Sequence, residues 1–219
     1  MQSHSKGTNF KKPEIRAVLR RKPAQVREKN KDFGDLAGGE ATRPFPKPLL
    51  REQRDPKGCI LFDWGDTLMR DFKEFSGPMK DWPRLEAIPG AAEMLAALHP
   101  HRILAIATNA ADSDEMNIRL ALQRVDLDRW LDTVYCFKNI GYKKPSREFY
   151  GHILADLKLA PPSVCMVGDN YEADILGANA CGIRGVWFKE HSLEESQAAL
   201  HRTIHSLADL PEALKLLFP

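Results

Sequence analysis

The sequence contains no long hydrophobic run. No apolar stretch in its 219 residues approaches the roughly 20 residues that a membrane-spanning helix needs. No apolar segment of the kind found in signal peptides follows Met1. We therefore expect a cytoplasmic protein that does not interact with a membrane.

Cysteine is also scarce, and its spacing does not suggest a metal site. None of the four cysteines belongs to a C-x-x-C pair, which argues against zinc. Three of them lie in apolar, strand-like runs, where buried free thiols are common in reducing compartments. We expect free thiols rather than disulfides. The cysteines are Cys59, Cys136, Cys165 and Cys181.

The first 57 residues have few aromatic side chains and an excess of positive charge. They hold 15 Lys and Arg against 7 Asp and Glu, whereas residues 58–219 hold 17 against 23. Six prolines interrupt residues 1–57, which lack hydrophobic periodicity, so we expect a mostly disordered extension. A nucleic-acid-binding arm is the alternative. Only three aromatic residues accompany the basic ones, which favours a solvated tail.

From Gly58 onward, apolar strand-like runs alternate with helical segments. The apolar content of 43% is sufficient for one domain with a substantial core over residues 58–219. This alternation is typical of an α/β fold with a doubly wound, Rossmann-like parallel sheet. The predicted strands cover 59–63, 103–108, 133–137, 163–168 and 184–188, with a short one at 203–204. The predicted helices cover 90–99, 113–125, 147–157, 172–181 and 207–217.

Asp63 is the most informative residue of this domain, because it ends the first apolar run. A carboxylate at the carboxyl end of a buried parallel strand lies where open α/β sheets bind their ligands. A charge there is costly without a partner, so the position suits a nucleophile or a metal ligand. Candidate partners follow later in the chain: Thr108, Lys144, Asp169 and Asp174.

Four short motifs carry these residues. Each motif is weak alone, but their order and their places after predicted strands make the set specific. The motifs are Asp63-Trp64-Gly65-Asp66-Thr67, Ile106-Ala107-Thr108-Asn109, Gly141-Tyr142-Lys143-Lys144-Pro145 and Gly168-Asp169 with Asp174 beyond it. Through them the chain resembles the haloacid dehalogenase-like hydrolase superfamily over about residues 58–218.

The resemblance implies a phosphatase that works through an aspartyl-phosphate intermediate. In the family the first Asp attacks phosphorus, which makes Asp63 the expected nucleophile. The resemblance further implies that Thr108 holds a phosphoryl oxygen and that Asn109 orients the substrate. Lys144, immediately before a proline, would neutralise the nucleophile and the phosphoryl group.

The same resemblance implies Mg²⁺ as the cofactor. Asp63, Asp169 and the backbone carbonyl of Gly65 would supply the hard oxygen ligands that Mg²⁺ prefers. Asp174 would lie behind these ligands and pair with Lys144.

The first motif departs from the family pattern D-x-D-G-T. The second Asp of that pattern is the general acid and base, but Gly65 stands in its place and Asp66 follows. Loss of a positioned acid or base typically costs roughly 10²–10⁴ in rate. One hypothesis is that Asp66 or a water takes over proton transfer. The other is a weak or inactive enzyme.

The spacing between motifs leaves little room for a cap domain. Residues 69–88 are few, and residues 110–140 fit a core helix and strand. We expect an open site, suited to a large or macromolecular phosphorylated substrate or to closure by a second subunit. Two other functions stay open. One is a hydrolase of C–P or C–halogen bonds, whose family members also lack Asp at this position; the other is a phosphate- and metal-binding module.

Overall fold

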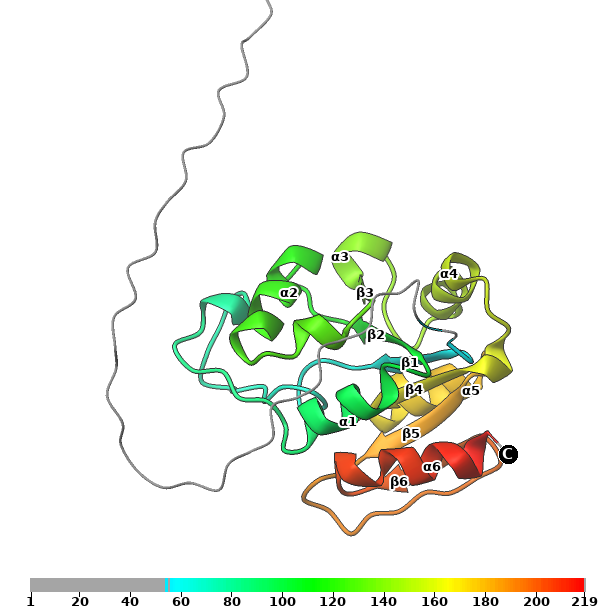
Figure 1. Cartoon of the computed structure of the whole chain (residues 1–219). Coiled ribbons are helices and arrows are strands. Elements are labelled where there is room, and N and C mark those ends of the chain that lie inside the picture. Colours follow the sequence, from blue (N-terminus) through cyan, green and yellow to red (C-terminus); the bar gives the residue numbers. More distant parts are fainter. Residues whose placement is uncertain (1–53, 55, 219) are drawn as a thin grey trace, which may run out of the picture. The chain divides into compact units, whose positions relative to one another are not determined.

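The computed structural model describes Arg54 and residues 56–218. These residues form a six-stranded parallel sheet with the strand order β3-β2-β1-β4-β5-β6 (Figure 1). The strands are β1 (Cys59–Phe62), β2 (Ile103–Thr108), β3 (Thr133–Cys136), β4 (Val164–Gly168), β5 (Arg184–Phe188) and β6 (His201–Ile204). The α-helices are α1 (Ala91–Leu98), α2 (Glu115–Arg124), α3 (Phe137–Ile140), α4 (Arg147–Leu157), α5 (Gly177–Asn179) and α6 (Leu210–Leu217).

Burial on both sides explains why the central strands read as continuous apolar runs. Every residue of β1, β2 and β4 is buried. Side chains alternate between the two faces of a strand, so an entirely buried strand needs cover on both faces. Such strands are typical of a parallel sheet that lies between two layers of helices.

The two hydrophobic clusters of the domain correspond to the two faces of the sheet. Ile60 and Phe62 pack in one cluster with residues of α1, α2 and α6. Cys59 and Leu61 pack in the other with residues of α4 and α5. Helices therefore cover both faces, and the predicted doubly wound parallel sheet is confirmed.

The strand order determines where a ligand site can form. From β1 the chain adds β2 and β3 on one side of the sheet and β4, β5 and β6 on the other. The order therefore reverses between β1 and β4, and crevices at such a switch point bind ligands in open α/β sheets. Asp63 directly follows β1 and Asp169 directly follows β4.

Three helix predictions needed correction. The helix predicted over 207–217 begins with a 3₁₀ turn, Leu207–Asp209, before α6. The helix predicted over 172–181 is a π-helix, Tyr171–Leu176, that continues into α5. The Asn170 side chain accepts the Ala173 backbone N–H and starts this turn; π-helical turns are frequent at functional sites. The helix predicted from residue 113 begins after Asp114, whose side chain caps it by accepting the Asn117 N–H.

The folded part of the chain includes residues before the expected boundary at Gly58. The Arg54 side chain is 1% exposed and pairs with Asp132, and the Lys57 N–H donates to the His101 carbonyl. The rest of the expected basic extension lies outside the described residues. Within the described part of the chain, no helix has the length and apolar character needed to span a bilayer.

Candidate active site

A cavity of about 370 Å³ lies at the carboxyl ends of β1, β2 and β4. Its volume falls within the range typical of small-molecule sites. All eight residues predicted for the site line this one cavity, although they come from four separate segments of the chain. They are Asp63, Gly65, Asp66, Thr108, Asn109, Lys144, Asp169 and Asp174.

The Lys144 ammonium lies between two carboxylates. Its Nζ is 2.6 Å from Oδ1 of Asp63 and 2.7 Å from Oδ1 of Asp174, and its side chain is 2% exposed. Burial alone would lower the pKa of Lys144, but the charges of Asp63 and then Asp174 outweigh it and raise the pKa. The lysine therefore stays protonated and holds the Asp63 carboxylate in a fixed place.

Asn109 fixes the backbone of Lys144. Its side-chain carbonyl accepts the Lys144 N–H at 2.8 Å, and its amide group donates to the Lys144 carbonyl at 3.0 Å. This pair of bonds ties the lysine loop to the end of β2. The structure thus shows a positioning contact for Asn109, and its predicted contact with a substrate stays a prediction.

Thr108 is buried at the last position of β2 and borders the cavity. Its hydroxyl oxygen accepts the Ala110 N–H at 3.2 Å, which turns the chain sharply after the strand. A threonine hydroxyl that accepts one bond still has its hydrogen to donate. Thr108 can therefore offer a hydrogen bond to a ligand oxygen, as predicted for a phosphoryl group.

Asp169 is held at the end of β4 by contacts to its backbone and side chain. Its carbonyl accepts the Trp187 indole N–H at 2.8 Å, and Thr67 approaches its carboxylate at 3.5 Å. Burial first and then the charge of Asp63 raise the pKa of Asp169 to about 6. The carboxylate therefore loses its proton reluctantly in the absence of a nearby cation.

Asp174 reaches the site from the π-helix and packs closely against β4. A Cβ placed on Gly168 would lie 2.1 Å from the Asp174 carboxylate, so only glycine fits at that position. The Asn170 N–H donates to Asp174 at 3.1 Å. Burial raises the pKa of Asp174, and the adjacent Lys144 acts in the opposite direction.

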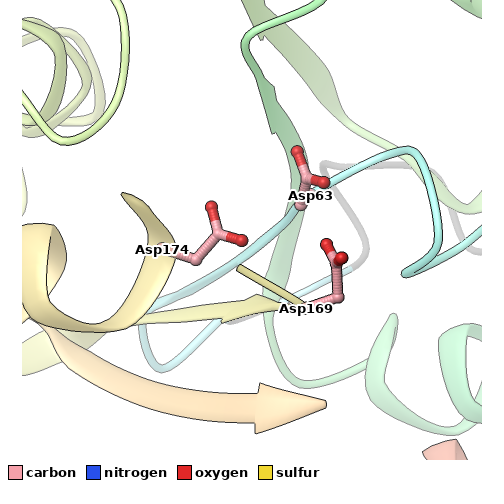
Figure 2. Close-up of side chains that lie close together, drawn as sticks. All are labelled: Asp63, Asp169 and Asp174. Atoms are coloured by element: carbon pink, nitrogen blue, oxygen red, sulfur yellow. The ribbon is translucent and has the colours of Figure 1, made fainter. Parts of the chain in front are cut away.

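The three carboxylates converge closely enough to hold a metal ion. One oxygen from each of Asp63, Asp169 and Asp174 lies within 4.8 Å of the others (Figure 2). Three carboxylates against the single Lys144 ammonium leave an excess of two negative charges, which a divalent cation would neutralise. Hard oxygen donors suit Mg²⁺. Asp63 and Asp169 are the residues that could hold it, because the Asp174 side chain is only 1% exposed, whereas that of Asp63, although it also contacts Lys144, is 15% exposed.

Asp66 has a different environment from the other predicted residues. Its backbone is left-handed, with φ of 52°, and its carboxylate accepts the Asp71 N–H at 3.0 Å. Lys73 lies 3.5 Å from the same carboxylate. Asp66 borders the cavity, but these contacts join it to the loop that follows β1.

Sequence reasoning missed three charged residues that line the cavity: Asp112, which follows β2, and the neighbouring pair Asp71 and Lys73. Asp71 and Lys73 form an ion pair with each other. They come from the irregular segment between β1 and α1, which also contributes Met79 and Trp82 to the cavity wall. Because neither residue follows a strand or belongs to a motif, only their proximity in sequence to Asp66 could have indicated them.

Comparison with known proteins agrees with this geometry. A family model for haloacid dehalogenase-like hydrolases matches residues 61–182. The chain is 35% identical over 199 residues to the ribulose-1,5-bisphosphate 5-phosphatase of Halopiger xanaduensis, an alignment that covers 87% of this chain and 78% of that protein. It is 29% identical over 129 residues to the pyrimidine 5'-nucleotidase YjjG of Escherichia coli, which covers 58% of this chain and 56% of that protein.

A solved structure has the same fold. The crystal structure of an uncharacterized protein from Listeria monocytogenes serotype 4b is similar, with a TM-score of 0.65 and 26% sequence identity. That similarity covers 74% of this chain and 98% of the Listeria chain. The match to the family model and the 35% identity over most of the chain establish the relationship: the chain belongs to the haloacid dehalogenase-like hydrolase family.

Proposed function

We propose that this protein is a Mg²⁺-dependent phosphatase that acts through an aspartyl-phosphate on Asp63. The observation that carries the proposal is the buried contact of Lys144 with Asp63 and Asp174 at the switch point of the sheet. It holds the Asp63 carboxylate beside a positive charge and orients it at the cavity, as a carboxylate nucleophile must be.

The chain's own residues supply most of what the first step requires. A carboxylate oxygen of Asp63 attacks phosphorus, and the bond from phosphorus to the leaving oxygen breaks. The Thr108 hydroxyl and the Lys144 ammonium are placed to hold phosphoryl oxygens as charge develops on them. Asn109 fixes the position of Lys144 in the cavity through two hydrogen bonds from its side chain to the Lys144 backbone.

A bound Mg²⁺ would reduce the electrostatic repulsion between the Asp63 carboxylate and the negatively charged phosphoryl group. Asp63 and Asp169 would hold it. The excess negative charge of the carboxylate cluster supports this assignment, because without a cation the cluster is costly to bury.

We propose a phosphomonoester as the substrate. One relative is named for action on ribulose-1,5-bisphosphate and another for action on pyrimidine nucleotides, so both names indicate phosphorylated small molecules. In the described structure, the segment between β1 and α1 contains one 3₁₀ helix, Met79–Asp81. Such a short segment leaves the site accessible to a large or macromolecular substrate as well.

Hydrolysis of 4-nitrophenyl phosphate tests the proposal. Turnover should require Mg²⁺ and should disappear when Asp63→Asn replaces the nucleophile with a group of the same shape. The exposed Glu74→Gln variant, with the same change in charge, should behave as the unsubstituted protein. Absence of turnover on sugar, nucleotide and phosphoprotein substrates would contradict the proposal. Retained phosphate or Mg²⁺ binding would then indicate a binding module.

A further inference from the structure

The space beside Gly65, where the family pattern has its acid, is filled by a carboxylate from elsewhere in the loop. A Cβ placed on Gly65 would lie 3.3 Å from the Cβ of Asp71 and 3.7 Å from its Oδ2. A longer side chain at position 65 and the Asp71 side chain would therefore compete for the same space. Asp71 lines the same cavity as Asp63, so a ligand in that cavity would lie between them and the rest of the site.

The exchange of Gly and Asp in the first motif has a structural consequence at position 66. This residue is left-handed, a conformation that suits the glycine of the family pattern and that Asp tolerates better than most side chains. In this conformation the Asp66 carboxylate accepts the Asp71 N–H, and the Asp66 N–H donates to the Met69 carbonyl at 2.7 Å. Asp66 therefore positions Asp71.

Lys73 restrains the other end of the Asp71 side chain. Its Nζ lies 2.5 Å from Oδ2 of Asp71, and this hydrogen bond is the largest cause that raises the pKa of Lys73. The Asp71 side chain is 38% exposed. Water can therefore reach Asp71, whereas the Asp174 side chain is 1% exposed and closed off from solvent.

From these contacts we infer that Asp71 is the general acid and base of the site, a catalytic role that rests on the proposed phosphatase reaction. In the first step, protonated Asp71 gives its proton to the leaving oxygen while Asp63 forms its bond to phosphorus. In the second step, ionised Asp71 takes a proton from water. The water oxygen bonds to phosphorus, the bond to Asp63 breaks, and inorganic phosphate leaves. Asp71 is then protonated again, and one water has been consumed.

The two steps depend differently on the leaving group, which makes the role of Asp71 measurable. A nitrophenolate leaves without a proton, so only the second step with 4-nitrophenyl phosphate needs Asp71. An alkoxide must be protonated as it leaves, so both steps with glycerol 2-phosphate need Asp71. A residue that only supports the fold would affect the two substrates equally.

The experiment compares the full-length protein with its Asp71→Asn, Asp66→Asn and Glu74→Gln variants in Mg²⁺. For Asp71→Asn we expect a burst of about one nitrophenol per protein. The steady rate that follows should be roughly 10²–10⁴-fold lower than that of the unsubstituted protein. Glycerol 2-phosphate should show at least the same loss and no burst. Asp66→Asn keeps an oxygen for the Asp71 N–H, so its loss should be smaller, and Glu74→Gln should match the unsubstituted protein.

A second variant separates a missing carboxylate from a damaged loop. Gly65→Asp combined with Asp71→Gly moves the carboxylate to the family position and removes the Cβ that would crowd it. We expect this variant to be at least tenfold more active on glycerol 2-phosphate than Asp71→Asn. Failure to recover would assign the loss to the loop and overturn the inference.

Two further results would overturn the assignment of Asp71, and a third would refute the phosphatase proposal. The Asp71→Asn rates could match those of Glu74→Gln on both substrates. The loss could be greater for Asp66→Asn than for Asp71→Asn, which would make Asp66 the proton carrier. Inactivity of the unsubstituted protein would refute the phosphatase proposal itself. This outcome is distinguishable from a wrong assignment of Asp71, because it is measured on the protein before any residue is changed.

Discussion

Two buried ion clusters lie at opposite ends of the sheet and differ in their charge balance. At the amino ends of the strands, Arg54 donates to both carboxylate oxygens of Asp132 at 2.7 and 3.0 Å, and it also donates to the Arg102 carbonyl. One cation meets one anion in the bidentate geometry that favours such pairs. The Leu104 N–H donates to the same carboxylate and helps to fix the start of β2.

At the carboxyl ends, one cation faces three anions. Lys144 contacts Asp63 and Asp174, while Asp169 lies beside them in the same cluster. Burial and like charge raise the pKa of Asp169, which means that the cluster is unfavourable when fully ionised. A balanced buried cluster stabilises the fold, whereas an unbalanced cluster indicates a site for a charged ligand.

The largest effect should follow from removing the cation of the unbalanced cluster. Lys144→Met leaves the buried Asp174 and the partly buried Asp63 without their ammonium and leaves the phosphoryl group without a charge partner. We expect phosphatase turnover to fall by at least about 10²–10³-fold. We also expect the free energy of unfolding to fall by about 3–5 kcal/mol. Lys143→Met is the matched control, because Lys143 is exposed and its ammonium lies over the Phe137 ring. Equal effects in the two variants would contradict the assignment.

Removing the cation of the balanced cluster should affect stability alone. Arg54→Met leaves the Asp132 carboxylate without its charge partner. It should lower the free energy of unfolding by about 3–5 kcal/mol, as measured by urea denaturation. The rate constant per folded molecule should stay unchanged. Arg84→Met, which removes an exposed guanidinium near Glu74 and Glu86, should cost less than about 1 kcal/mol. A loss of turnover in folded Arg54→Met would show that the two ends of the sheet are coupled.

Added Mg²⁺ should stabilise the protein by relieving the excess charge. At a concentration about 100 times its Kd, a ligand of the native state contributes about 2.7 kcal/mol, which is about 5–10 °C in Tm for a domain of this size. The increase should disappear in Asp169→Asn and persist in Arg84→Met. An equal increase in Asp169→Asn would place the ion elsewhere.

The smallest effect concerns pH in the absence of metal. The pKa of Asp169 is raised from 3.8 to about 6, so between these values the folded state binds more protons than the unfolded state. Its contribution therefore destabilises the fold progressively as pH rises from about 4 to about 6, and stays constant above that. Asp169→Asn removes this contribution. In EDTA, urea denaturation should show the variant gaining stability relative to the unsubstituted protein over that range, and a constant difference would contradict the assignment.

Much of the fold followed from local patterns. The apolar runs of β1, β2 and β4 predict buried parallel strands, and Asp63 and Asp169 are identifiable because each ends such a run. Choosing Lys144 over Lys143 required resemblance to a family, because both lysines lie in the same loop. The structure places Lys144 in the cavity and leaves Lys143 exposed.

What could not be predicted depends on contacts between distant or irregular segments. Arg54 and Asp132 are 78 residues apart and neither belongs to a motif, so the boundary at Gly58 was set too late for Arg54. The contact of Asn109 with Lys144 depends on how the loop after β2 meets the loop after α3. Asp71 lies beside Gly65 in a loop that is left-handed at Asp66 and in which the Asp71 N–H donates to the Asp66 carboxylate, and a local pattern does not reveal this arrangement.

We propose that the unbalanced cluster allows Asp63 to accept a phosphoryl group. The most direct test is to quench the protein with acid during turnover of 4-nitrophenyl phosphate in Mg²⁺ and to map the phosphorylated peptide by mass spectrometry. We predict one phosphoryl group on Asp63, with greater accumulation in Asp71→Asn and none in Asp63→Asn. A phosphoryl group on another residue, or turnover without any phosphorylated protein in either the unsubstituted form or Asp71→Asn, would contradict the account.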